Sequence, residues 1–138
     1  MSGVADAPRV NGRWALYDEK FITVPALDKH RYDTKKPLDW LQTIRDYVAG
    51  RTAEIDPLLD WVEQQTEPIT IDTLMGAGQG SAPMVDGAPN LKEVSRQFRA
   101  LLNPLVTDSV VSGTFGNVVR HNGLEAWRRL AEPINEAN

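Results

Sequence analysis

The chain has 138 residues, 41% of them hydrophobic and 25% charged, which is typical of one globular domain rather than of a disordered or fibrous protein. It contains no cysteine, which excludes disulfides, thiolate metal sites and a cysteine nucleophile, and it fits a cytoplasmic location, with a nuclear one as the alternative. The net charge of −4 argues against a domain that mainly binds nucleic acid, and no apolar run approaches the ~20 residues needed to cross a membrane.

The N-terminal part of the chain shows no helical periodicity. Residues 1–13 are small and polar, which predicts a disordered N-terminus. Residues 14–27 mix aromatic and β-branched side chains, so we expect an extended arm with at most one short strand. The polar residues 28–36 predict a loop. We expect this arm to lie on a single helical domain that spans residues 14–135.

Two helices are expected in the next segment. The first covers about residues 37–49, with Asp33 or Thr34 as its N-cap and Gly50 as its stop. The second begins at "DPLLDWVEQQ", where Asp56 is a good N-cap and the leucines that follow supply an apolar face.

The middle of the chain predicts a short helix, a loop and a long helix. Residues 69–75 suggest one more helical turn, and residues 76–90, with four glycines and two prolines, predict a loop. Asn90 then begins an amphipathic helix, which Pro104 should end or kink. Residues 104–113 predict another short helix that closes with a glycine.

The last element begins with Asn-Gly, which by itself favours a hairpin between strands. The residues that follow, "LEAWRRLAEPI", instead repeat apolar side chains at helical spacing, with Asn122 as N-cap and Glu125 completing a capping box. We therefore predict an all-α fold, a small bundle of about five or six short helices with an extended N-terminal arm. The expected core residues are Trp40, Ile44, Trp61, Val62, Phe98, Leu101, Leu124, Trp127 and Leu130.

The acidic residues and histidines do not compose a recognisable catalytic motif. Asp28, His30 and Asp33 are close enough in sequence to suggest a metal site, but nothing fixes their geometry in a polar loop. Three carboxylates on one side of the second helix are expected to be solvated. They are Asp56, Asp60 and Glu63. No nucleotide-binding motif is present, so we assign no cofactor, metal ligand or catalytic residue.

Lys92, Arg96 and Arg99 form the most notable group of charges. Their i, i+4, i+7 spacing places a basic stripe on one helix, away from its apolar face. Such a stripe suits contact with RNA phosphates or with an acidic face of a neighbouring subunit. An ordinary solvated helix surface is the simpler interpretation.

The order of these segments resembles the Gag capsid domain of copia-type long-terminal-repeat retroelements and related gag-like proteins, over about residues 20–135. The matching stretches are "KFITVPALD", "LDWLQTIRDYV", "IDPLLDWVE", "LKEVSRQFRALLNPLVTDSVV" and "NGLEAWRRL". In that family the domain typically ends with a helix of the form x-x-[EA]-A-W-x-x-L. Here the corresponding residues are Glu125, Ala126, Trp127 and Leu130.

The resemblance implies a structural protein without catalysis, whose copies assemble by homotypic contacts into a shell around retroelement RNA. No zinc knuckle is present, so a nucleic-acid-binding tail is expected either outside this chain or not at all, and the chain would correspond to an N-terminal capsid lobe. Two other functions stay open at this point. One is a small helical adaptor that binds a peptide or protein in a groove between helices, and the other is a small enzyme with a concealed polar site.

Overall fold

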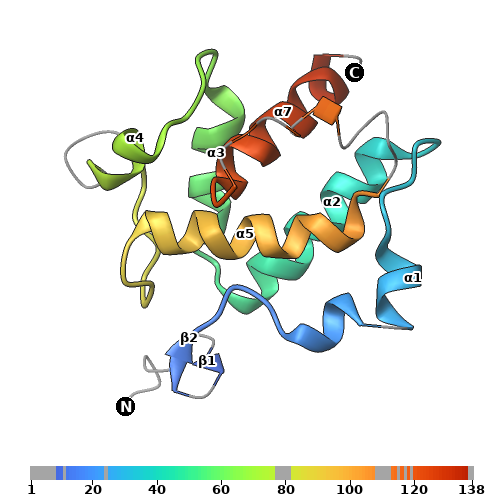
Figure 1. Ribbon diagram of the computed structural model, residues 1–138, viewed down its shortest axis with the longest axis horizontal. Coiled ribbons are helices and arrows are strands. Elements are labelled where there is room, and N and C mark those ends of the chain that lie inside the picture. Colours follow the sequence, from blue (N-terminus) through green and yellow to red (C-terminus); the bar gives the residue numbers. More distant parts are fainter. Residues whose placement is uncertain are drawn as a thin grey trace.

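The computed structural model describes residues 9–10, 12–23, 25–76, 82–107, 113–114, 116, 118 and 120–136. Within these residues the protein is all-α, as the sequence predicts (Figure 1). The sequence predicts disorder for residues 1–13. Residues 1–8 and 11 lie outside the description, but residues 9–10 and 13 belong to a short strand pair, so the prediction is wrong there. Of the short helix predicted within residues 104–113, residues 108–112 lie outside the description, and residues 104–105 belong to the long helix that precedes it.

The elements follow one another as two minimal strands and a series of helices. In chain order they are β1 (Arg9–Val10), β2 (Arg13–Trp14), the 3-10 helix η2 (Glu19–Ile22), α1 (Ala26–His30), α2 (Pro37–Arg51), α3 (Ile55–Gln64), α4 (Ile71–Met75), α5 (Leu91–Leu105) and α7 (Gly123–Glu136). The two strands pair antiparallel and form only a two-residue ladder.

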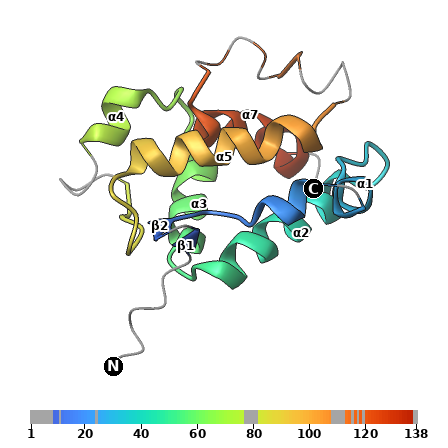
Figure 2. The ribbon, with the colours of Figure 1, turned by 60° about the horizontal axis from the view of Figure 1, so that its bottom comes forward.

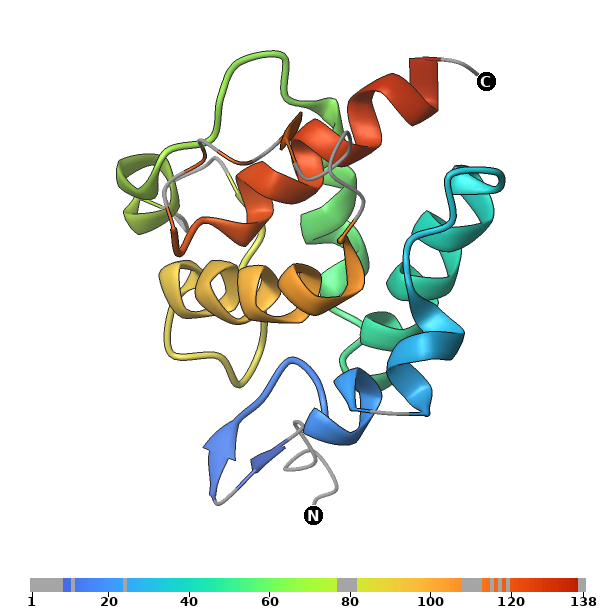
Figure 3. The ribbon, with the colours of Figure 1, turned by 45° about the vertical axis from the view of Figure 1, so that its right-hand side comes forward.

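Helices α5 and α7 form the centre of the molecule, with α3 packed against α7 (Figures 1 and 3). The buried apolar side chains make one continuous cluster to which every long helix contributes. Trp127 is fully buried in it, with ring centroids 5.4 Å from Phe98 and 6.2 Å from Trp40. Eight of the nine predicted core residues are buried, namely Trp40, Ile44, Val62, Phe98, Leu101, Leu124, Trp127 and Leu130.

Trp61 departs from the predicted core. It is only half-buried and packs against the edge of the cluster. Leu58, Leu59 and Val62 are fully buried and define the inward side of α3, and helical geometry places Trp61 at the margin of that side. Its indole therefore covers the core without entering it.

The Asn-Gly pair begins a helix, as predicted, and the glycine has a packing role that the sequence did not reveal. The Oδ1 atom of Asn122 accepts the backbone N–H of Glu125 at 3.3 Å, so Asn122 is the N-cap of α7. A Cβ atom on Gly123 would lie 2.1 Å from the backbone nitrogen of Arg99 and 2.5 Å from the carbonyl oxygen of Ser95. The start of α7 therefore touches the backbone of α5 directly, and only glycine permits this approach.

The predicted extended arm and polar loop are wrong in detail. Residues 19–22 form a 3-10 turn and residues 26–30 form α1, while residues 9–14 contain the strand pair. Short elements of this kind need help from the rest of the fold, because few of their backbone groups are bonded locally. The arm runs beside α5 and α2, as Figure 2 shows.

Side chains from α2 and α5 hold the arm in place through its backbone. Gln97 accepts the N–H of Leu16 at 2.7 Å and donates to the carbonyl of Trp14 at 3.2 Å. The hydroxyl of Tyr47 accepts the N–H of Asp18 at 2.9 Å. These partners are between 29 and 83 positions away in sequence, so no local sequence pattern predicts the contacts.

The predicted N-caps of α2 and α3 are wrong, whereas that of α5 is confirmed. Helix α2 follows Lys36 without a side-chain cap, because Asp33 accepts the N–H of Lys35 instead, and the helix continues past Gly50. Helix α3 begins before Asp56. The Oδ1 atom of Asn90 accepts the N–H of the third residue of α5 at 2.8 Å.

The end of α5 and the loop before it agree with expectation. The helix ends at Leu105, one residue after Pro104. Of the residues in the predicted loop that the structure describes, Ala82 and Val85 are buried and anchor the segment on the core. Among the described helices, none has the length and apolar character of a membrane span.

Candidate functional site

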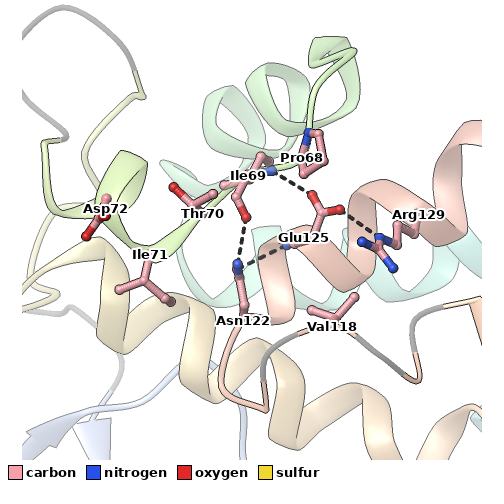
Figure 4. Close-up of a pocket in the computed structure, with 9 residues that line it drawn as sticks. All are labelled: Pro68, Ile69, Thr70, Ile71, Asp72, Val118, Asn122, Glu125 and Arg129. Atoms are coloured by element: carbon pink, nitrogen blue, oxygen red, sulfur yellow. Dashed lines mark hydrogen bonds and ion pairs between the residues drawn. The ribbon is translucent and has the colours of Figure 1, made fainter.

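A groove between the segment before α4 and the start of α7 is lined in part by the buried polar side chains of Asn122 and Glu125 (Figure 4). Its volume is about 290 Å³. It is lined by Pro68, Ile69, Thr70, Ile71, Asp72, Val118, Asn122, Glu125 and Arg129. The sequence predicted only a helix cap here, so the chemistry of the groove has to be judged from its contacts.

Asn122 forms one side of the floor. Its Nδ2 atom donates to the carbonyl of Ile69 at 2.7 Å, and its Oδ1 atom accepts the hydroxyl of Ser95 at 2.9 Å. The same serine oxygen accepts the N–H of Leu124 at 3.0 Å. Asn122 therefore joins α5, α7 and the segment before α4, in addition to capping α7.

Glu125 forms the other side and is buried, although it was expected to complete a capping box. Its Oε1 atom accepts the N–H of Ile69 and the Nε–H of Arg128, at 2.8 and 2.7 Å. Its Oε2 atom accepts from Arg128 and from Arg129, both at 2.8 Å. A carboxylate offers about four lone-pair sites, and all four are occupied here.

The protonation of Glu125 follows from these contacts. Burial alone would raise the pKa of its carboxyl, but hydrogen bonds from Arg128, the Ile69 N–H and Arg129 outweigh burial and lower that pKa below its usual value. A general base must accept a proton from its substrate. A carboxylate with a lowered pKa and no free lone pair does this poorly. The carboxylate of Glu125 is therefore bonded to groups of the protein itself.

Arg128 is the buried cation that pairs with Glu125. Its side chain is only 8% exposed. Hydrogen bonding to Glu125 raises the pKa of Arg128, and burial opposes this only in part. On a solvated helix an i, i+3 ion pair contributes little stability. This pair is buried, so the loss of one partner would leave an uncompensated charge in the interior.

A second polar cluster joins α2 to α3. Of the three carboxylates expected to be solvated, Asp56 and Asp60 keep side chains that are 49% and 59% exposed, whereas the side chain of Glu63 is 19% exposed. Arg45 forms ion pairs with Asp56 at 2.9 Å, with Asp60, and with Glu63 at 3.1 Å. Burial lowers the pKa of Arg45, but hydrogen bonds to Asp60 and Asp56 raise it overall. Glu63 also accepts the indole N–H of Trp127 at 3.0 Å. These carboxylates hold helices together around one cation.

The predicted basic stripe is not uniform. Lys92 is exposed, but Arg96 is bound at 2.5 Å by Glu93, and this pairing raises the pKa of Arg96. Arg99 is half-buried, donates to Asn103 at 3.0 Å, and has a pKa lowered by burial. The three side chains share a helix as predicted, yet the local charge is partly compensated, which weakens the case for phosphate binding through this face.

Neither histidine enters a polar cluster. The ring of His30 stacks on Phe21 at a centroid distance of 4.5 Å, and burial lowers its pKa. His121 is exposed in the turn before α7. In the described part of the chain no three His, Cys, Asp or Glu side chains gather as metal ligands would. The suspected set Asp28, His30 and Asp33 is not brought together as a site.

Comparisons with known protein families, with curated proteins and with solved structures gave no match to this chain. Function must therefore be argued from the sequence and from the geometry above.

Proposed function

We propose that the chain is a structural, self-assembling capsid-type domain, similar to the Gag capsid of copia-type retroelements. Its copies would form a shell around retroelement RNA in the cytoplasm through homotypic contacts, without catalysis. RNA would be bound by regions outside this chain. This proposal extends the resemblance in the order of segments to function.

The observation that carries the proposal is the position of the resembling motif. Glu125, Ala126, Trp127 and Leu130 are at most 3% exposed, and their helix contacts α2, α3 and α5. The residues that carry the likeness are therefore the ones that determine how the helices pack. Proteins that share these core residues are expected to share the packing of their helices.

The chemistry of the two polar clusters is consistent with a structural role. Glu125 has all its acceptor sites filled by the protein, and Arg45 is surrounded by three carboxylates of α3. Both clusters join separate elements. Such hydrogen-bonded networks hold the helices in fixed positions, which suits a domain that presents the same surface to each neighbouring copy.

A helical adaptor is the second candidate, and one observation favours it. A mainly apolar groove of about 220 Å³ lies between the start of α2 and the end of α7. Grooves between helices can take an amphipathic peptide. The same groove would serve a second copy of the chain, so its existence does not separate the two functions.

Measurement of mass as a function of concentration tests the proposal. Light scattering after size-exclusion chromatography, from micromolar to millimolar protein, should show a mass that rises with concentration, and electron microscopy should show oligomers or particles. A strictly monomeric protein at millimolar concentration would contradict self-assembly and leave the adaptor as the better function.

A further inference from the structure

One end of the molecule carries an apolar groove with a basic rim. The groove is lined by Tyr32, Pro37, Thr114, Arg129, Leu130, Pro133 and Ile134. Lys35 and Lys36 immediately precede Pro37 and are exposed. In the described residues neither lysine forms an ion pair, so both charges face solvent beside the apolar lining. Leu38, 43% exposed, follows Pro37 on α2 and lines a separate, smaller hollow with Leu41.

The other end carries exposed methionines beside carboxylates. Met75, the last residue of α4, is 57% exposed, and Asp72 lies one turn earlier on the same helix. Met84 is 50% exposed and Asp86 follows it in the segment before α5. The exposed charges of α4 and of the described segment before α5 are Asp72 and Asp86, both negative, whereas the nearby cations Arg129 and Lys92 belong to α7 and to the first turn of α5.

The two ends lie on opposite sides of the molecule in Figure 1. Figure 1 shows α4 and the segment before α5 at the left of the molecule, while the start of α2 and the end of α7 lie at its right. Met75 and Met84 therefore cannot fill the groove of their own molecule. A contact between them requires a second copy and would be heterologous, joining molecules head to tail.

We propose that Met75 of one copy inserts into the groove between α2 and α7 of the next, while its Asp72 faces Lys35 and Lys36. An unbranched thioether side chain adapts readily to an irregular apolar groove. Opposite charges at the rim set the orientation and disfavour the reverse pairing. This inference rests on the proposed self-assembly and names the surfaces that would perform it.

Charge reversal on each side, followed by mixing, tests the contact. The first variant is Lys35→Glu with Lys36→Glu, and the second is Asp72→Lys with Asp86→Lys. Each alone should weaken self-association by about tenfold or more, because like charges then meet across the contact. An equimolar mixture should recover association, since each altered end finds an opposite charge on the other variant. Light scattering and sedimentation velocity measure both effects.

Matched controls separate this contact from general charge effects. Lys20→Glu and Asp46→Lys alter exposed charges away from both ends and should leave association unchanged. Met75→Ser should weaken association, whereas Met84→Ser, at a similarly exposed methionine of the same end, should have a smaller effect. Circular dichroism and thermal melting confirm that each variant is folded.

The outcomes distinguish this contact from the function on which it rests. If the wild-type protein associates but the charge variants behave like the controls, or if the mixture fails to recover association, the proposed contact is wrong and self-assembly stands. If the wild-type protein stays monomeric at millimolar concentration, both proposals are overturned.

Discussion

Glu125 accepts the backbone N–H of Ile69 at 2.8 Å across 56 positions of sequence. Asn122 meets the same residue from its other side, donating to the carbonyl of Ile69 at 2.7 Å. One side chain of α7 and the side chain of its N-cap thus satisfy both backbone groups of one buried residue, as a neighbouring strand would. This clamp fixes the segment between α3 and α4 to the centre of the fold.

Replacement of Glu125 should be strongly destabilising. Glu125→Gln keeps the shape but removes the charge opposite the buried Arg128, so the free energy of unfolding should fall by about 3–5 kcal/mol. Urea denaturation followed by circular dichroism measures the change. Glu132→Gln is the matched control, because Glu132 is 52% exposed and lies 3.4 Å from the same arginine. Its effect should stay within about 0.5 kcal/mol. Equal losses in the two variants would contradict the clamp.

Stability should fall on acidification because the pKa values of Glu125 and Glu93 are both lowered in the folded protein. A carboxyl with a lowered folded-state pKa contributes stability that is complete above its unfolded pKa, about 4.3, and is lost as pH falls through the folded value. Burial also lowers the pKa of His30, so urea midpoints should begin to decline below about pH 6.5, the unfolded pKa of histidine, and should decline further below about pH 4 as the carboxyls are protonated. In Glu125→Gln this second decline should be shallower. An unchanged pH profile in that variant would place the acid sensitivity elsewhere.

Helices with strong local signals could be predicted from the sequence. Helix α5 has a good N-cap in Asn90, an apolar residue at every helical repeat and a proline at its end, and each signal acts within a few residues. Helix α7 was likewise predicted from the periodicity that follows Asn122. Local propensity and tertiary packing agree in both helices, so the pattern alone was sufficient.

Features determined by distant partners could not be predicted in the same way. The arm is held by Gln97 and Tyr47, which lie in other helices, so its own composition suggested only an extended chain. Glu125 has the spacing of a capping box, and that pattern is the same whether the carboxylate turns back to the cap or reaches Ile69. The choice depends on a contact that exists only after folding.

Gly123 should tolerate no side chain. In Gly123→Ala the new Cβ would meet backbone atoms of Ser95 and Arg99 at 2.5 and 2.1 Å, and backbone cannot move aside without separating α5 from α7. We expect a loss of at least about 1–3 kcal/mol in unfolding free energy. Gly50→Ala is the matched control, since Gly50 is inside α2 with nothing within 4 Å of a new Cβ. Alanine there should stabilise the protein by about 0.5–1 kcal/mol. A neutral Gly123→Ala would show that the two helices are not in backbone contact.

Tryptophans 127 and 61 should respond differently to truncation, because burial and not residue type sets the effect. Trp127 is fully buried between Trp40 and Phe98, so Trp127→Ala should reduce the unfolding free energy by about 3–5 kcal/mol. Trp61 is half-buried at the edge of the core, and Trp61→Ala should cost clearly less. Thermal and urea denaturation of the two variants compare them directly. A Trp127→Ala protein with near-native melting would show that this indole is not in the core and would favour an interface role for it.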